Sequence, residues 1–119
     1  MTVLYWYPAK KDLKSYTIPF GVVSIERYAF NKCFNLFSIT IPHSVQTINN
    51  YAFSECMNLT SIVIPPSVIS ICKGPFYHCT NLVSITLPPH IQSLGKCFAT
   101  ECESLSHVEL PSSLESIPP

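Results

Sequence analysis

Cysteine and histidine are the side chains of this chain best suited to chemistry, and their spacing limits what that chemistry can be. The 119 residues include six cysteines and four histidines, and in a short chain such a content suggests disulfides or a zinc site. No two cysteines form a C-x-x-C pair, and the histidines occupy four unrelated positions: His43, His78, His90 and His107. We therefore expect no zinc, no other metal and no cofactor.

Four of the six cysteines recur every 23 residues, at Cys33, Cys56, Cys79 and Cys102. In a stack of repeats such neighbours point the same way from positions one repeat apart, so their Cβ atoms exceed the ~3.5–4.5 Å that a disulfide needs. Free cysteine packs well as a small buried hydrophobe. We expect these four thiols to be buried and unpaired, whereas Cys72 and Cys97 lie off this column and are candidates for exposed thiols.

Catalytic motifs are missing from the sequence. The three glycines, Gly21, Gly74 and Gly95, are isolated, so there is no glycine-rich phosphate loop, and neither G-x-S-x-G nor H-E-x-x-H occurs. His107 and Glu109 share one side of a predicted strand and form a conceivable acid–base pair. Without a nucleophile or a pocket, a solvated surface pair is the simpler interpretation. The sequence predicts that the protein is not an enzyme.

The elements that would position these residues follow the same 23-residue period. Prolines and apolar residues recur with it and without a single insertion, as in Pro19, Pro42, Pro65, Pro88 and Pro111, and in Ile25, Ile48, Ile71, Leu94 and Ile117. A fixed period of roughly 20–50 residues indicates a solenoid, in which stacked coils together bury a core that one coil cannot bury alone.

Each repeat contains a strand with one buried face. Residues Leu59 to Pro65 alternate between apolar and other side chains, which is the two-residue period of a strand, and the proline that follows cannot extend the hydrogen-bond ladder. The residues expected to point inward are Ile39, Ile41, Ile62, Ile64, Ile85, Leu87, Val108 and Leu110. The residues expected to point outward are Ser38, Thr40, Ser61, Val63, Ser84, Thr86, His107 and Glu109. This outward set is the candidate ligand-binding surface.

The remaining residues of each repeat predict the secondary structure on the back of the coil. Val45, Ile48, Phe53 and Cys56 are spaced by three, five and three residues, which fits neither a clean strand nor a long amphipathic helix. We expect a short strand or extended turn there, followed by one helical or 3₁₀ turn.

Charge and hydropathy restrict the partners. Hydrophobic residues make up 47% of the chain, charged residues 12%, and the net charge is zero. Because Lys/Arg cluster only at Lys10, Lys11 and Lys14, nucleic acid is not an expected partner. Residues 1–40 carry five Lys/Arg against two Asp/Glu (+3), and residues 96–119 one Lys against four Glu (−3). No apolar run reaches the roughly 18 residues of a membrane span, so membrane insertion is not expected. Residues 1–7 lack the features of a signal peptide.

The unit from Ile39 to Ser61 resembles the BspA-type leucine-rich repeat. It reads Ile-x-Ile-Pro-x-Ser-Val-x-x-Ile-x-x-Tyr-Ala-Phe-x-x-Cys-x-Asn-Leu-x-Ser, and residues 4–11 and 16–19 resemble the segment that opens such arrays. The departures are Gly74-Pro75 for Tyr-Ala, His90 for Ser, and a shift at residues 97–99, where Phe98 replaces the aromatic from one position away. The resemblance implies a cell-surface or secreted protein that attaches to host proteins or other cells.

Together these features predict a leucine-rich-repeat solenoid of 23-residue coils, with parallel strands on one face and short strands or turns on the back. Residues 1–119 are expected to form one array of about four to five coils, partial at both ends and part of a longer protein. The expected function is non-enzymatic recognition of a protein or glycan through the strand face. The alternative is a structural element that self-associates end to end.

Overall fold

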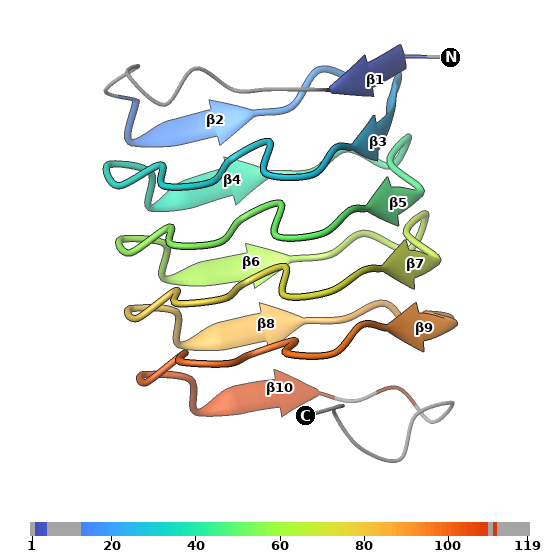
Figure 1. Cartoon of the computed structure of the whole chain (residues 1–119). Helices are drawn as coiled ribbons and strands as arrows, with labels where there is room; N and C mark the ends of the chain where they lie inside the picture. The colour runs from blue at the N-terminus through green and yellow to red at the C-terminus, as the bar shows by residue number, and fades with distance from the viewer. Residues whose placement is uncertain (1, 5–12, 110, 112–119) are drawn as a thin grey trace.

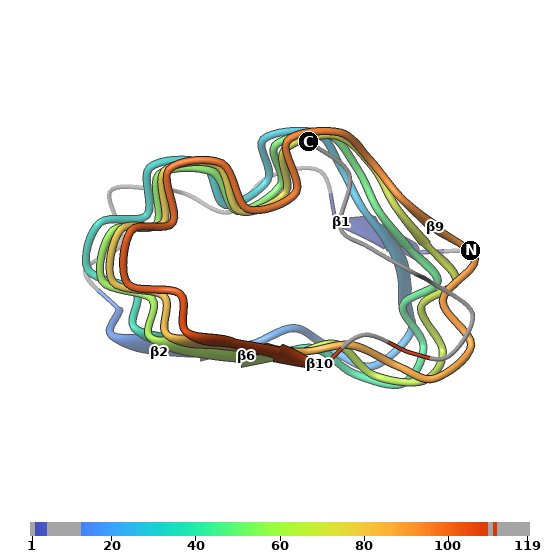
Figure 2. The ribbon, with the colours of Figure 1, turned by 90° about the horizontal axis from the view of Figure 1, so that it is seen from below.

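The computed structural model describes residues 2–4, 13–109 and 111, with the backbone alone at residues 2–4 and 109. The chain winds in successive coils that stack on one another (Figure 1). Viewed along the stack, the coils superimpose on one closed outline, with two groups of strands on different sides of it (Figure 2). This repetition is the direct result of the 23-residue sequence period.

One strand of each coil contributes to a front face. These front strands are β2 (Ser15–Thr17), β4 (Ser38–Thr40), β6 (Ser61–Val63), β8 (Ser84–Thr86) and β10 (His107–Glu109). They pair in parallel with a register of one sequence period, as in Tyr16 with Ile39 and Ile62 with Ile85. The pairing forms two ladders, β2-β4 and β6-β8-β10, and no ladder joins β4 to β6 among the described residues.

A second side carries shorter strands. They are β1 (Thr2–Leu4), β3 (Val22–Ile25), β5 (Thr47–Ile48), β7 (Ser70–Ile71) and β9 (Ser93–Leu94), which pair in parallel in that order. The inward residues of β3, β5 and β7 are β-branched, a type that suits a half-buried pleated surface, and Ile25, Ile48 and Ile71 are buried. The short back strand expected from the sequence is therefore confirmed.

The third side is a succession of turns. Ala29 N–H donates to Glu26 O at 3.1 Å, and two similar turns follow within the next four residues. Alternate N–H groups donate instead to the next coil: Tyr28 to Asn50 O (3.1 Å), Phe30 to Ala52 O (2.7 Å) and Lys32 to Ser54 O (2.9 Å). Local and inter-coil bonds thus share the backbone groups between them.

Left-handed backbone explains why this side does not become a helix. Tyr28 and Lys32 both have φ of 61°, and a right-handed helix cannot continue through such residues. Residues one, two and three periods later behave alike, at Tyr51, Gly74 and Cys97 and at Glu55, His78 and Glu101. Within the described residues, separate turns therefore take the place of the helical or 3₁₀ turn that we expected.

The core is a set of stacked columns. Phe30, Phe53 and Phe76 are fully buried and stack at centroid distances of 5.1 and 5.7 Å, with interplanar angles of 10° and 13°. Phe98 is also fully buried, but it meets Phe76 edge-on, at 5.6 Å and 85°. The shift of one position is therefore absorbed by a change of ring orientation.

Candidate functional site

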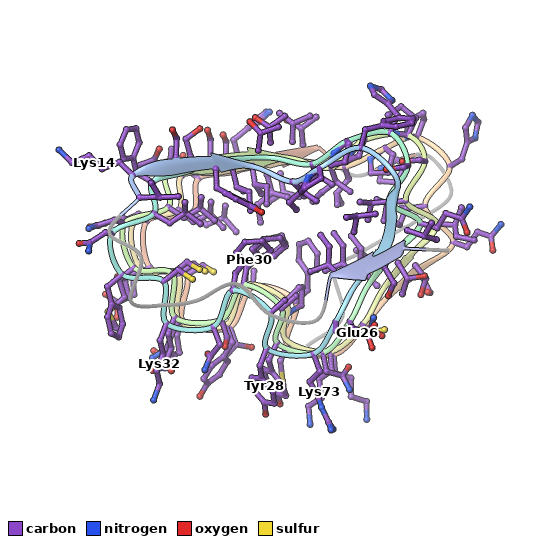
Figure 3. The ribbon with its side chains drawn as sticks, turned by 90° about the horizontal axis from the view of Figure 1, so that it is seen from above. Lys14, Glu26, Tyr28, Phe30, Lys32 and Lys73 are labelled. Atoms are coloured by element: carbon purple, nitrogen blue, oxygen red, sulfur yellow. The ribbon has the colours of Figure 1, made fainter. Side chains whose placement is uncertain are left out.

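The front face presents the predicted outward residues. Their alternation with buried Ile39, Ile62 and Ile85 follows from the strand period. Exposed side chains are those of Ser38, Thr40, Ser61, Val63, Thr86 and His107, while Ser84 is half-buried. Glu109 ends β10, and its side chain lies outside what the structure describes. Figure 3 shows the row of side chains that projects from these strands beside Lys14.

A hollow of about 360 Å³ lies on this face between β4 and β6. Four predicted residues line it, namely Ser38, Thr40, Ser61 and Val63, together with the edges of inward residues and the corner residues His43, Pro65 and Pro66. The hollow coincides with the break between the two front ladders. The structure therefore brings half of the predicted surface residues into one concave site.

Backbone hydrogen bonds locate the same break. Ile18 N–H donates to Thr40 O at 3.0 Å, and Ile64 N–H donates to Thr86 O at 2.9 Å, so each links its coil to the next. Among the described residues, Ile41 makes no corresponding bond to Val63. One backbone bond still joins these two coils ahead of the strands, from Thr60 N–H to Phe37 O at 3.5 Å.

A second hollow, of about 520 Å³, lies where the chain turns into the front strands. It is lined by Lys14, Asn35, Phe37, Asn58, Thr60 and Asn81, and we call it the asparagine groove. Its volume is within the roughly 300–1,000 Å³ typical of small-ligand sites. The sequence alone did not predict this groove, although the 23-residue period of the asparagines and the neighbouring Phe37 were visible signals.

The cysteine column is a ladder of thiols that bond to backbone. Cys56 donates to Phe30 O at 3.1 Å, Cys79 to Phe53 O at 3.1 Å and Cys102 to Phe76 O at 3.0 Å. Cys33, Cys56 and Cys79 are buried, and Cys102, Cys72 and Cys97 are half-buried. Cys56, Cys79 and Cys102 therefore each link their coil to the preceding one.

The pKa values of Cys56, Cys79 and Cys102 are raised, so these three thiols stay protonated, whereas the hydrogen bond with Cys56 lowers the pKa of Cys33. Burial raises the pKa of Cys79 to about 12 and also raises that of Cys102. The adjacent Cys33 thiol, and then burial, raise the pKa of Cys56. Since the thiolate is the form that ligates metals and attacks electrophiles, Cys56, Cys79 and Cys102 are poor ligands. Among the described residues, no three His, Cys, Asp or Glu side chains lie where they could hold a metal.

The fold and its columns define the class of protein. Parallel front strands, one per coil, with a buried leucine and a turn asparagine ahead of β4, β6 and β8, make a leucine-rich-repeat solenoid. The BspA type leucine-rich repeat region matches residues 5–119 in six copies. The chain belongs to the BspA-type leucine-rich repeat family, as its repeat pattern indicated.

Solved structures support this assignment. A leucine-rich repeat protein from Bacteroides ovatus is 33% identical with a TM-score of 0.79, over 86% of this chain and 26% of that one. The pneumococcal vaccine antigen PcpA is 25% identical with a TM-score of 0.87, over 92% and 27%. A leucine-rich cell surface protein from Faecalibacterium prausnitzii is 27% identical with a TM-score of 0.64, over 87% and 34%. The chain thus spans about a quarter to a third of these proteins.

Two further findings concern curated relatives and membrane-spanning helices. A search of curated proteins found no match to the chain. In the part of the chain that the structure describes, no helix has the length and apolar character needed to cross a membrane.

Proposed function

We propose that this array is a non-enzymatic binding module that recognises a protein or a glycan through its front face. The observation that carries the proposal is the hollow between β4 and β6, because Ser38, Thr40, Ser61 and Val63 all line it. A cell-surface or secreted location is part of the proposal. It is supported by the description of the Faecalibacterium relative as a cell surface protein and of PcpA as a vaccine antigen.

The chemistry of the face suits close contact with a macromolecule. Short hydroxyl side chains lose little conformational entropy when a partner covers them, and they both donate and accept hydrogen bonds. Val63 is 62% exposed between the flanking threonines Thr40 and Thr86, and it supplies apolar area at the centre of the patch. Repetition of the face on successive coils lets weak contacts add up.

No catalytic step is part of the proposal. His107, the one candidate acid–base residue whose side chain is described, lines neither of the two hollows. His43 also lines the β4–β6 hollow, but among the described residues no hydrogen bond joins its imidazole to a serine hydroxyl, as the activation of a serine nucleophile would require. Binding alone is the function that these groups support.

A matched pair of variants tests the proposal. Beads coated with the chain are applied to epithelial cell monolayers and to a printed array of defined glycans. Val63→Lys places a charge in the front hollow, while Ile69→Lys places the same charge at an aliphatic residue that is 44% exposed and lines neither hollow. We expect Val63→Lys to reduce retention several-fold and Ile69→Lys to leave it unchanged. Equal retention by the two variants would contradict the proposal.

A second candidate function is end-to-end assembly, and burial in the last described coil favours it. Cys79, Leu82 and Ile85 are fully buried, whereas their counterparts one period later, Cys102, Leu105 and Val108, are only half-buried. The core columns of the last described coil are thus less covered than those of the coil before it, and partly exposed apolar columns favour contact with another coil.

A further inference from the structure

We infer that the asparagine groove is a saccharide site that selects N-acetylated sugars. This inference rests on the proposed binding function, since it assigns a glycan class to a groove at the margin of the front face. Lys14, Phe37 and Thr60 line the groove from one position of three successive coils, and Asn35, Asn58 and Asn81 line it from a second position. At roughly 4.8 Å per coil, the three asparagines span about 10 Å. An extended disaccharide matches that span.

Hydrogen bonding leaves acceptors available inside the groove. Asn58 Nδ2 donates to Phe34 O at 2.7 Å, a bond that fixes the orientation of the amide. Its Oδ1 has no partner among the described residues, and the Asn81 side chain makes no hydrogen bond within that part of the chain. The site therefore offers one fixed amide acceptor, at Asn58, and one coil further an amide at Asn81 that can donate and accept.

The other three lining residues supply an apolar surface and hydrogen-bond donors. Phe37 is 46% exposed although it precedes a strand whose inward residue, Ile39, is buried. An exposed aromatic ring beside polar groups suits the apolar face of a sugar ring or the methyl of an acetyl group. Thr60 and Lys14 also line the groove, and they provide a hydroxyl and an ammonium group. None of the six lining residues is acidic.

These groups complement an acetamido substituent better than a plain sugar hydroxyl. An acetamido group carries an N–H donor, a carbonyl acceptor and a methyl. The N–H would donate to an asparagine Oδ1, the carbonyl would accept from Thr60 or Lys14, and the methyl would contact Phe37. A sugar that lacks the group leaves these polar partners unpaired, and unpaired polar groups are the strongest source of discrimination in a site.

Two disaccharides that differ only in the acetamido groups give a direct test. N,N′-diacetylchitobiose and cellobiose share the same linkage and ring backbone, and each is titrated into the ¹⁵N-labelled chain while backbone and asparagine amide signals are followed by NMR. We expect diacetylchitobiose to shift the side-chain amides of Asn58 and Asn81 and to bind weakly, with Kd on the order of 1 mM, as befits an open site. Cellobiose should bind about tenfold more weakly or not at all.

Variants separate this site from the front face. Phe37→Ala and Asn81→Ala should each weaken diacetylchitobiose about tenfold, whereas Phe20→Ala, at a phenylalanine 82% exposed that does not line the groove, should have no effect. Thr40→Lys with Thr86→Lys should leave sugar binding intact. These outcomes would support the inference.

Three other outcomes would overturn it. Equal binding of the two disaccharides would remove the role of the acetamido group. Binding that is lost in the Thr40→Lys/Thr86→Lys variant but kept in Phe37→Ala would place the sugar on the front face, so that the proposed function stands and the groove does not. Absence of shifts with either sugar up to its solubility limit would refute a saccharide groove, while retention of beads on cells still decides the proposed function separately.

Discussion

The phenylalanine column shows how strongly stability depends on single residues at the centre of each coil. Phe53 lies between Phe30 and Phe76 and is fully buried. Replacing it with alanine removes ring contacts on both sides and leaves a cavity, so Phe53→Ala should cost about 3–5 kcal/mol of unfolding free energy. That loss is comparable to the whole stability of a small domain, roughly 5 kcal/mol at the lower end.

Urea unfolding followed by circular dichroism measures this free energy, and thermal unfolding gives the melting temperature. Phe20→Ala is the matched control, because Phe20 is 82% exposed and its removal should change stability by less than about 0.5 kcal/mol. A melting temperature for Phe53→Ala within a few degrees of the parent would show that the stacked column does not hold the coils together.

The buried thiols predict a dependence of stability on alkaline pH. Burial raises the pKa of Cys79 to about 12 from an ordinary value of 9.0. Between these values the unfolded chain releases the proton while the folded chain retains it, so the stability contributed by this group is complete below pH 9 and is lost towards pH 12. Urea unfolding under reducing conditions at pH 7.5 and 10.5 should show a smaller fall in Cys79→Val than in the parent. An identical fall in both chains would contradict this role of Cys79.

At the scale of elements, the front strands could be predicted because Ile62 and Ile64 alternate with Ser61 and Val63, and this alternation shows the strand period directly. It also fixed which side chains face solvent. The turns of the third side could not be predicted, because most of their left-handed positions are occupied by residues such as Tyr, Lys and Glu instead of glycine, the usual sequence signal.

The asparagine groove was missed for a related reason. Phe37 and Ser38 are adjacent and both exposed, so the chain bends between them and the strand alternation stops there. Sequence spacing gives the column of each residue but not the direction of its side chain at a bend. The groove therefore emerges only once the coils are placed in space.

The left-handed turns carry a prediction of their own. Lys32 has φ of 61° and is exposed, and a non-glycine residue in this conformation costs roughly 1–2 kcal/mol. Lys32→Gly should therefore stabilise the chain by about 0.5–1 kcal/mol, after allowance for the greater entropy of glycine in the unfolded state. Arg27→Gly, in the same turn region but without positive φ, should destabilise it by about 0.5–1 kcal/mol. Thermal or urea unfolding that moved both variants in one direction would be inconsistent with the left-handed turn.

At the scale of the whole molecule, the first and the last part of the sequence differ in charge. Residues 1–40 carry +3 and residues 96–119 carry −3, and the core columns of the last described coil are only half-buried. Such unlike ends favour head-to-tail contacts, which need not close into a ring. We predict concentration-dependent oligomers by light scattering, with weaker association at moderate salt because screening reduces the charge attraction. A chain that stays monomeric at high concentration and low salt would argue against end-to-end assembly.

The central claim is that the front face is the surface through which the molecule binds, and four lysines placed on it test that claim most directly. Thr40→Lys, Ser61→Lys, Val63→Lys and Thr86→Lys together change exposed residues of β4, β6 and β8. The control carries four lysines on the second side, at exposed Gln46, Ile69, Gln92 and Ser93.

Both variants are first required to match the parent in circular dichroism and unfolding midpoint, and coated beads are then applied to epithelial cells under flow. The account predicts that the front-face variant loses most of its retention while the second-side variant retains that of the parent. Undiminished retention by the front-face variant, or equal loss by both, would contradict it.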